Sequence, residues 1–246
     1  MSKESRTRSV AVAGICAALV WLATVAFQLY IPETKGYFNI GESMVYASAL
    51  LFGPTIGAFA GGVGSALADV TTGYLVYAPG TLIIKGVEGF VAGFLVISLK
   101  KIPKNAWKPL ILTLGVVLSA LVYFVGVSYY ATSGEPASIT IGLPQLGQGE
   151  ILVSLPSLFW SIVAVVVLVV MTFVGLKVDS ETGSLVLAAG IAGPFMILGY
   201  FLYEYFVLGF GIGALAEVPF NVGQVLVGIL IATPLSKVVR KVLKIS

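Results

Sequence analysis

Polar side chains are scarce in this sequence, and several recur at spacings that would place them on one face of a helix. Glu217, Asn221 and Gln224 follow an i, i+4, i+7 spacing and would form a single stripe. Lys85 and Glu88 would lie one turn apart. The full set of candidate substrate-binding residues is Asn39, Glu42, Asp69, Tyr74, Tyr77, Lys85, Glu88, Tyr200, Glu204, Glu217, Asn221 and Gln224. Carboxylates, amides and tyrosine rings of this kind can hold a small ring-containing solute without changing it chemically.

Other kinds of chemistry are excluded by residues that the sequence lacks. There is no histidine, which removes Ser-His-Asp triads, His-ligated metals and imidazole acid–base catalysis. The single cysteine, Cys16, lies in an apolar run and cannot form an internal disulfide. No G-x-x-x-x-G-K-[ST] loop occurs, so the chain has no P-loop for ATP hydrolysis. We therefore expect no catalytic residues, no metal and no cofactor, and active transport would need an ion gradient or a partner.

The composition indicates the environment of these side chains. Of 246 residues, 58% are hydrophobic and only 10% are charged, whereas roughly a quarter of a soluble domain is charged. The mean hydropathy is +1.04. A soluble chain of this length cannot bury so much apolar side chain, so the surplus must face lipid. This excludes a soluble enzyme, a nucleic-acid-binding protein and a disordered chain.

Apolar blocks predict eight helices. They span residues 10–29, 43–53, 55–72, 80–98, 109–130, 151–176, 185–207 and 217–236. The second is short, and Gly53-Pro54 separates it from the third; if 43–72 formed one kinked helix, there would be seven. Eight spans place the basic residues near 3–8, 100–108, 177 and 237–244 on one side, as the positive-inside rule favours. We expect a multi-pass plasma-membrane protein with both termini cytoplasmic and outer loops at 30–42, 73–79, 131–150 and 208–216.

In this topology every candidate residue lies in an outer loop or in the outer half of a helix. The result is a polar, aromatic cup that is open outside and closed beneath, which suggests solute capture and not a pore. Five carboxylates oppose Lys85 alone, so we expect a neutral or cationic ring compound and not an anion.

Simpler interpretations of the same residues stay open at this point. Glu42, Asp69 and Glu217 could be solvated helix ends. Lys85 and Glu88 could be a structural ion pair, and most tyrosines could belong to an interfacial aromatic belt. Asn221 and Gln224 are harder to explain in this way, because two amides deep in a helix need partners.

Small residues repeat every four positions in several of these blocks. The series are Gly53, Gly57, Gly61 and Ser65, then Gly89 and Gly93, and in the first helix Ala13 and Ala17 with Gly14 and Ala18. Such faces let helix backbones approach closely, so we expect internal helix packing in the third and fourth helices. The face on the first helix could pack internally or dock another membrane protein.

Several ordered motifs together resemble one family. They are N-I-G-E at 39–42, L-F-G-P at 51–54, G-S-A-L-A-D at 64–69, Y-A-P-G-T-L-I-I-K-G-V-E-G at 77–89, G-Y-F-L-Y-E-Y at 199–205 and A-E-V-P-F-N-V-G-Q-V-L-V-G at 216–228. The set resembles the substrate-binding S components of energy-coupling factor (ECF) vitamin transporters, most closely the riboflavin-type group.

The resemblance implies a six-helix core with an external vitamin site and docking on a transmembrane T subunit that two cytoplasmic ATPases drive. It implies docking through Ala13 and Ala17. By motif position, it carries substrate contacts onto Asn39, Glu42, Asp69, Tyr74, Tyr77, Lys85, Glu204, Glu217 and Asn221. The chain departs from a six-helix core by an added hairpin at about 109–176. We therefore divide it into 1–98 (helices one to four), 99–184 (inserted transmembrane hairpin) and 185–246 (C-terminal core helices and basic tail).

The sequence thus predicts an all-α integral membrane protein that binds riboflavin, a thiamine-type pyrimidine or another vitamin precursor from outside. Two alternatives remain. One is a stand-alone secondary carrier for a ring-containing solute, although no inverted repeat is obvious. The other is an intramembrane enzyme that works through carboxylates, such as Asp69 with Glu88 or Glu217.

Overall fold

The computed structural model describes residues 3–99, 103, 106–133, 137–140, 150–153, 156–177 and 179–244. Lys100, Lys101 and Lys104 of the predicted basic side lie outside these residues, as do positions 134–136 and 141–149 of the predicted outer loop. Within the described part the α-helices are α1 (Lys3–Ala26), α2 (Glu42–Phe52), α3 (Pro54–Thr72), α4 (Ala78–Ser98), α5 (Trp107–Ser133), α6 (Ser157–Lys177), α7 (Ser180–Leu202) and α8 (Val218–Leu243). This confirms the all-α fold class, with eight helices and a short second one.

Six helical segments of the described chain are long and apolar enough to cross a membrane, namely α1, α4, α5, α6, α7 with its continuation to Val207, and α8 with its 3-10 extension from Gly211. Helix α2 has 11 residues and is too short. Helix α3 has 19 residues but contains four glycines and Asp69, which lower its hydropathy. It packs against α1, α2 and α4, so other helices cover much of its surface.

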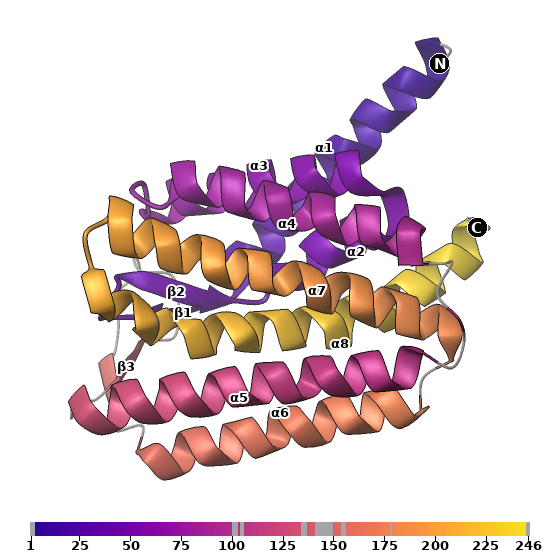
Figure 1. Cartoon of the computed structure of the whole chain (residues 1–246). Helices are drawn as coiled ribbons and strands as arrows, with labels where there is room; N and C mark the ends of the chain where they lie inside the picture. Colours follow the sequence, from indigo (N-terminus) through magenta and orange to yellow (C-terminus); the bar gives the residue numbers. More distant parts are fainter. Residues whose placement is uncertain are drawn as a thin grey trace.

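The helices run up and down between two ends of one bundle. Both termini lie at one end, and the links α1–α2, α3–α4, α5–α6 and α7–α8 lie at the other (Figure 1). At the terminal end, Lys237 pairs with Asp179 at 3.1 Å and Arg240 donates to the carbonyl of Leu50 at 2.7 Å. The Thr182 backbone amide lowers the pKa of Asp179 to about 2, so this N-cap stays ionised near neutral pH. The basic ends of α5, α6 and α8 share this end of the bundle.

The glycine series allow α3 and α4 to pack backbone against backbone. A Cβ added to Gly61 would lie 2.6 Å from the carbonyl oxygen of Lys85, and one added to Gly89 would lie 2.2 Å from that of Gly57. Contacts that short are not compatible with a side chain, so glycine is required. The internal packing predicted for these residues is confirmed.

Several local predictions need correction. The predicted outer loop at 30–42 contains an antiparallel hairpin, β1 (Gln28–Ile31) with β2 (Gly36–Asn39). The apolar block from 151 is not helical at its start: β4 (Glu150–Val153) pairs with β3 (Ala137–Thr140), and α6 begins after Pro156. The predicted loop at 208–216 is largely a 3-10 helix, η3 (Gly211–Glu217). A π-helical turn, η2 (Tyr203–Val207), continues α7.

The two hairpins of the second half differ in how they pack. Helices α7 and α8 lie against α4 and α2, inside the bundle. Helix α5 lies on the outer side of α7 and α8, and α6 packs on α5 at the edge (Figure 1). That this hairpin is an addition to a six-helix core stays a prediction, as do the proposed domain boundaries.

Candidate functional site

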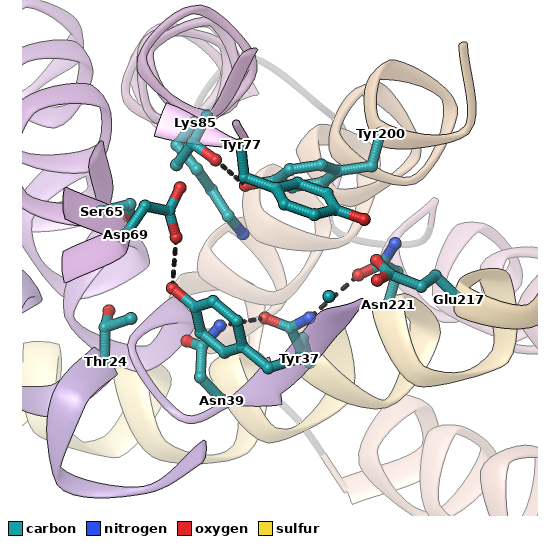
Figure 2. Close-up of a pocket in the computed structure, with 13 residues that line it drawn as sticks. Thr24, Tyr37, Asn39, Ser65, Asp69, Tyr77, Lys85, Tyr200, Glu217 and Asn221 are labelled. Carbon is teal, nitrogen blue, oxygen red and sulfur yellow. Dashed lines mark hydrogen bonds between the residues drawn. The ribbon is translucent and has the colours of Figure 1, made fainter. Parts of the chain in front are cut away.

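A polar cavity lies inside the bundle at the end opposite the two termini. It is formed by the end of α1, the β1–β2 hairpin, the C-terminal part of α3 and the last turn of α7, together with Glu217 and the N-terminal parts of α4 and α8 (Figure 2). Its volume is about 20 Å³, which is room for about one water molecule. The residues that line it are Thr24, Gly36, Tyr37, Asn39, Ser65, Asp69, Tyr77, Thr81, Lys85, Tyr200, Glu217, Asn221 and Gln224.

One wall is the carboxylate of Asp69, which the hairpin reaches through Tyr37. The Tyr37 hydroxyl donates to Asp69 Oδ1 at 2.5 Å, and the Tyr37 ring lies 4.4 Å from that of Tyr74. Burial, and next the charge of Asp69, raise the pKa of Tyr37 well above its usual value, so the hydroxyl stays a donor. Asp69 Oδ2 makes no hydrogen bond among the described residues, although the Thr81 hydroxyl lies beside the carboxylate.

A second wall is a chain of amides that joins the hairpin to α8. Asn39 Nδ2 donates to Gln224 Oε1 at 2.9 Å, and Gln224 Nε2 donates to Asn221 Oδ1 at 2.9 Å. Asn39 Oδ1 accepts from the backbone amide of Gly41 at 2.8 Å. The stripe on α8 therefore faces the interior, and its amides have the partners that their burial requires.

A third wall holds Glu217, at the end of η3, and Tyr77, with the carboxylate of Glu204 on η2 behind it. Thr34 Oγ1 donates to Glu217 Oε1 at 2.5 Å, while the Tyr77 hydroxyl lies 2.7 Å from the Thr34 carbonyl and 3.5 Å from Glu204 Oε1. Glu204 Oε2 has no partner among the described residues. Burial, followed by the charges of Glu217 and Glu204, raises the pKa of Tyr77, which therefore remains protonated.

The floor is built around Lys85, which is 3% exposed. Its ammonium is paired with Glu42 and, at 3.2 Å, with Glu88. Tyr46 donates to the other oxygen of Glu88 at 2.8 Å. We call these four residues the ion-pair cluster: Lys85, Glu42, Glu88 and Tyr46.

The aromatic ring of Tyr200 also lies near this floor. Lys85 Nζ is 5.8 Å from the Tyr200 ring centroid, and the Tyr200 hydroxyl donates to Thr81 at 3.0 Å.

Three other buried carboxylates differ from the ion-pair cluster, namely those of Asp69, Glu204 and Glu217. Within the described part of the chain, none of them forms an ion pair. We call them the uncompensated carboxylates. Their exposed fractions are 2%, 0% and 4%. Burying a carboxylate without a nearby cation costs free energy. We therefore expect a bound group that supplies protons or positive charge to stabilise these three side chains.

The structure brings all twelve predicted residues to this end of the bundle, and each is at most 9% exposed. Eight of them line the cavity: Asn39, Asp69, Tyr77, Lys85, Tyr200, Glu217, Asn221 and Gln224. Glu42 and Glu88 lie behind Lys85, Glu204 behind Tyr77, and Tyr74 behind Tyr37. The alternative of solvated helix ends is wrong for Glu42, Asp69 and Glu217, since all three are buried.

Sequence reasoning missed several lining residues. Tyr37 and Gly36 belong to the unpredicted hairpin, and Thr24, Ser65 and Thr81 are hydroxyl residues within apolar blocks. Thr81 lies one turn before Lys85, a spacing that would have revealed it.

The small residues of α1 are divided between two surfaces. Ala17 is 6% exposed, and its carbonyl oxygen would lie 2.6 Å from a Cβ at Gly64 of α3. Ala13 is half-buried, whereas Gly14 and Ala18 are exposed. In this conformation the open small-residue face of α1 is therefore that of Gly14 and Ala18, and docking through Ala13 and Ala17 stays a prediction.

Comparison with known proteins gives two matches. A family model described as "ECF-type riboflavin transporter, S component" matches residues 4–177. A protein from Pyrococcus woesei described as "Uncharacterized protein in gap 3'region" is 40% identical over 138 residues, which cover 54% of this chain and 88% of that protein. No solved structure matches.

The family match includes α1 to α6 and ends before α7. Five candidate residues lie beyond the matched region, in α7, η2, η3 and α8: Tyr200, Glu204, Glu217, Asn221 and Gln224. Their place in the candidate site therefore rests on the geometry of these elements and not on the family match.

Proposed function

Because this chain belongs to the ECF-type riboflavin transporter S component family, we propose that it captures a ring-containing vitamin or vitamin precursor from outside the cell and delivers it unchanged to an importer. The family supports a small-molecule substrate and ECF T and ATPase partners in general. The observation that carries the proposal is the cavity with its uncompensated carboxylates at one end of an otherwise apolar bundle. We place this end outside the cell and both termini in the cytoplasm, in accord with the basic residues at the terminal end.

The side chains around the cavity favour a particular class of ligand. Tyr37, Tyr77 and Tyr200 offer aromatic faces, and Asn221 with Gln224 offers amide groups. Asp69 adds an oxygen free to accept a hydrogen bond. A neutral or cationic heterocycle with N–H donors fits this set, and riboflavin and thiamine-type pyrimidines belong to this class. An anion would face the carboxylates of Asp69 and Glu217, while Lys85 is held by its two glutamates.

A ligand of that size cannot enter a cavity of about 20 Å³ without rearrangement. The β1–β2 hairpin closes the cavity through Tyr37 and Asn39, which bond to Asp69 and Gln224. We propose that a ligand replaces these contacts and that the hairpin then closes over it. The chain has no P-loop, so transport would depend on a T subunit and two cytoplasmic ATPases.

Native mass spectrometry of the purified full chain, followed by calorimetric titration, tests the ligand class. The pairs to compare are riboflavin with its phosphate ester and thiamine with its monophosphate, because each pair differs by an added anion. We expect one unphosphorylated member to bind one-to-one and its phosphate to bind at least about tenfold more weakly. Tighter binding of a phosphorylated member would contradict the proposal.

Uptake by cells that carry the chain separates the alternatives. We expect uptake to require co-expressed T subunit and ATPases and to survive a protonophore. Uptake by the chain alone that a protonophore abolishes would favour a secondary carrier. Recovery of a chemically altered solute would favour an enzyme.

A further inference from the structure

The proposed function does not involve the α5–α6 hairpin, yet one end of this hairpin reaches the candidate site. Helix α5 lies against α7, α8 and η3, and α6 packs on α5 (Figure 1). The contact with η3 is made near the end of α5 that carries Tyr130. The hairpin therefore touches the segment that ends in Glu217.

The contact consists of one hydrogen bond and a row of stacked rings. The Tyr130 hydroxyl donates to the carbonyl oxygen of Ala216 at 3.0 Å. The Tyr130 ring stacks on Trp160 of α6 with centroids 4.9 Å apart, and Trp160 meets the ring of Phe220 edge-on at 5.7 Å. Tyr130 and Trp160 are 5% and 2% exposed. The hairpin thus holds residues 216 and 220, on either side of Glu217.

The segment held in this way has little rigidity of its own. Helix η3 is a 3-10 helix of seven residues, whereas runs beyond about four residues are uncommon because their hydrogen-bond geometry is poor. It follows Gly209 at φ 76° and begins at Gly211 with φ 56°, values that glycine adopts easily in many conformations. External contacts must therefore keep η3 in place.

The site leaves little room for Glu217 to move. Its Oε1 lies 2.5 Å from Thr34 Oγ1, and only 1.7 Å from the position that a Cβ on Gly36 would take. Glu217 also lies beside Glu204, within reach of a shared hydrogen bond. A small displacement of η3 would break these contacts together.

We propose that the α5–α6 hairpin is a brace for the substrate site and that Tyr130 is a positioning residue, which fixes Glu217 by holding the backbone at Ala216. The effect on ligand binding rests on the proposed function, whereas the effect on η3 does not. Trp160 supports the Tyr130 ring and the first turn of α8.

Hydrogen exchange of the full chain in nanodiscs, read by mass spectrometry, tests the brace. Tyr130→Phe keeps the ring and removes only the hydroxyl. We expect backbone amides in 211–221 to exchange about fivefold faster, as the loss of one buried hydrogen bond implies. The matched control is Tyr123→Phe on the same helix, because Tyr123 is 44% exposed and its ring lies against Phe124. We expect the control to exchange like the parent. Trp160→Leu, which removes the stacked ring, should raise exchange in the same peptide.

The outcomes separate the brace from the proposed function. Parent-like exchange at 211–221 in both Tyr130→Phe and Trp160→Leu would overturn the brace, whatever the ligand results. Faster exchange at 211–221, with α3 and α4 unchanged, supports it. If the parent binds riboflavin or thiamine, Tyr130→Phe should weaken that binding about threefold to tenfold and leave the melting temperature nearly unchanged. If the parent binds no probe while the exchange difference persists, the proposed function fails and the brace stands.

Discussion

Two groups of buried carboxylates lie close together in this bundle, and they differ in how their charge is balanced. In the ion-pair cluster, Glu42 and Glu88 share Lys85, and Tyr46 adds a hydroxyl donor. The uncompensated carboxylates Asp69, Glu204 and Glu217 have hydroxyl groups as neighbours and, among the described residues, no cation paired with them.

The difference indicates two roles. A buried charge that has its partner within the protein contributes to the structure, and removing that partner is costly. A buried carboxylate that lacks a cation is unfavourable in the free protein, and sites of this kind gain binding at the expense of stability. We therefore assign the ion-pair cluster to the floor of the site and the uncompensated carboxylates to the ligand.

The largest effect is expected at Lys85. Lys85→Met would leave two buried carboxylates without a cation, so we expect the free energy of unfolding to fall by about 3–5 kcal/mol. The melting temperature of the purified protein in detergent measures the change. As a control, Lys85→Met combined with Glu42→Gln and Glu88→Gln should recover most of the loss. A single variant as stable as the parent would show that Lys85 is not the balancing charge.

The next effect is on binding and concerns Asp69. Asp69→Asn keeps the shape and removes the charge that faces the cavity. We expect the ligand dissociation constant to rise by roughly 10- to 150-fold, as for a lost charged hydrogen bond worth about 1.5–3 kcal/mol. The melting temperature should stay the same or rise, because a costly buried charge is gone. Calorimetric titration and thermal unfolding check both results. Unchanged affinity with lower stability would move Asp69 to the structural group.

A moderate effect is expected where α3 meets the helix turn that carries Lys85. A Cβ on Gly61 would lie 2.6 Å from the Lys85 carbonyl oxygen, so Gly61→Ala should separate α3 from α4. We expect destabilisation by about 1–3 kcal/mol in thermal unfolding. Gly86→Ala is the matched control, since its Cβ would have no neighbour nearer than 3.6 Å. Equal stability of the two variants would contradict the close packing of these helices.

The smallest effect is expected at Tyr37. Tyr37→Phe removes one hydroxyl donor from Asp69 and leaves the ring, so we expect a change in ligand affinity of about threefold to tenfold. Stability should change by less than about 0.5 kcal/mol, because the ring of Tyr37 still contacts Tyr74. A larger loss of stability than of affinity would indicate that the hairpin contact is structural.

Much of the architecture follows from local sequence patterns. The long apolar blocks predict the helices, because a segment that crosses lipid must satisfy its backbone hydrogen bonds internally and therefore forms a helix. The i, i+4, i+7 spacing correctly brought Glu217, Asn221 and Gln224 to one interior face. The glycine series indicated close helix packing, and the structure has it between α3 and α4.

The parts that sequence reasoning missed depend on contacts between distant segments. The sequence spacing pairs Lys85 with Glu88, three positions away, but its second partner, Glu42, lies 43 positions away. Thr34 and Tyr37 enter the site through a short hairpin within an otherwise irregular loop, and four-residue strands carry little periodic signal. The π-helical turn around Glu204 also has no pattern that distinguishes it from the rest of α7.

The central claim is that the uncompensated carboxylates belong to a ligand site at the closed polar end of the bundle. A ligand-bound structure of the full chain tests it most directly. The account predicts a ring compound among Tyr37, Tyr200 and the α8 amides, with a nitrogen donor within about 3.2 Å of Asp69. A ligand seated in the apolar groove between α5 and α7, with the polar cavity unchanged, would contradict it.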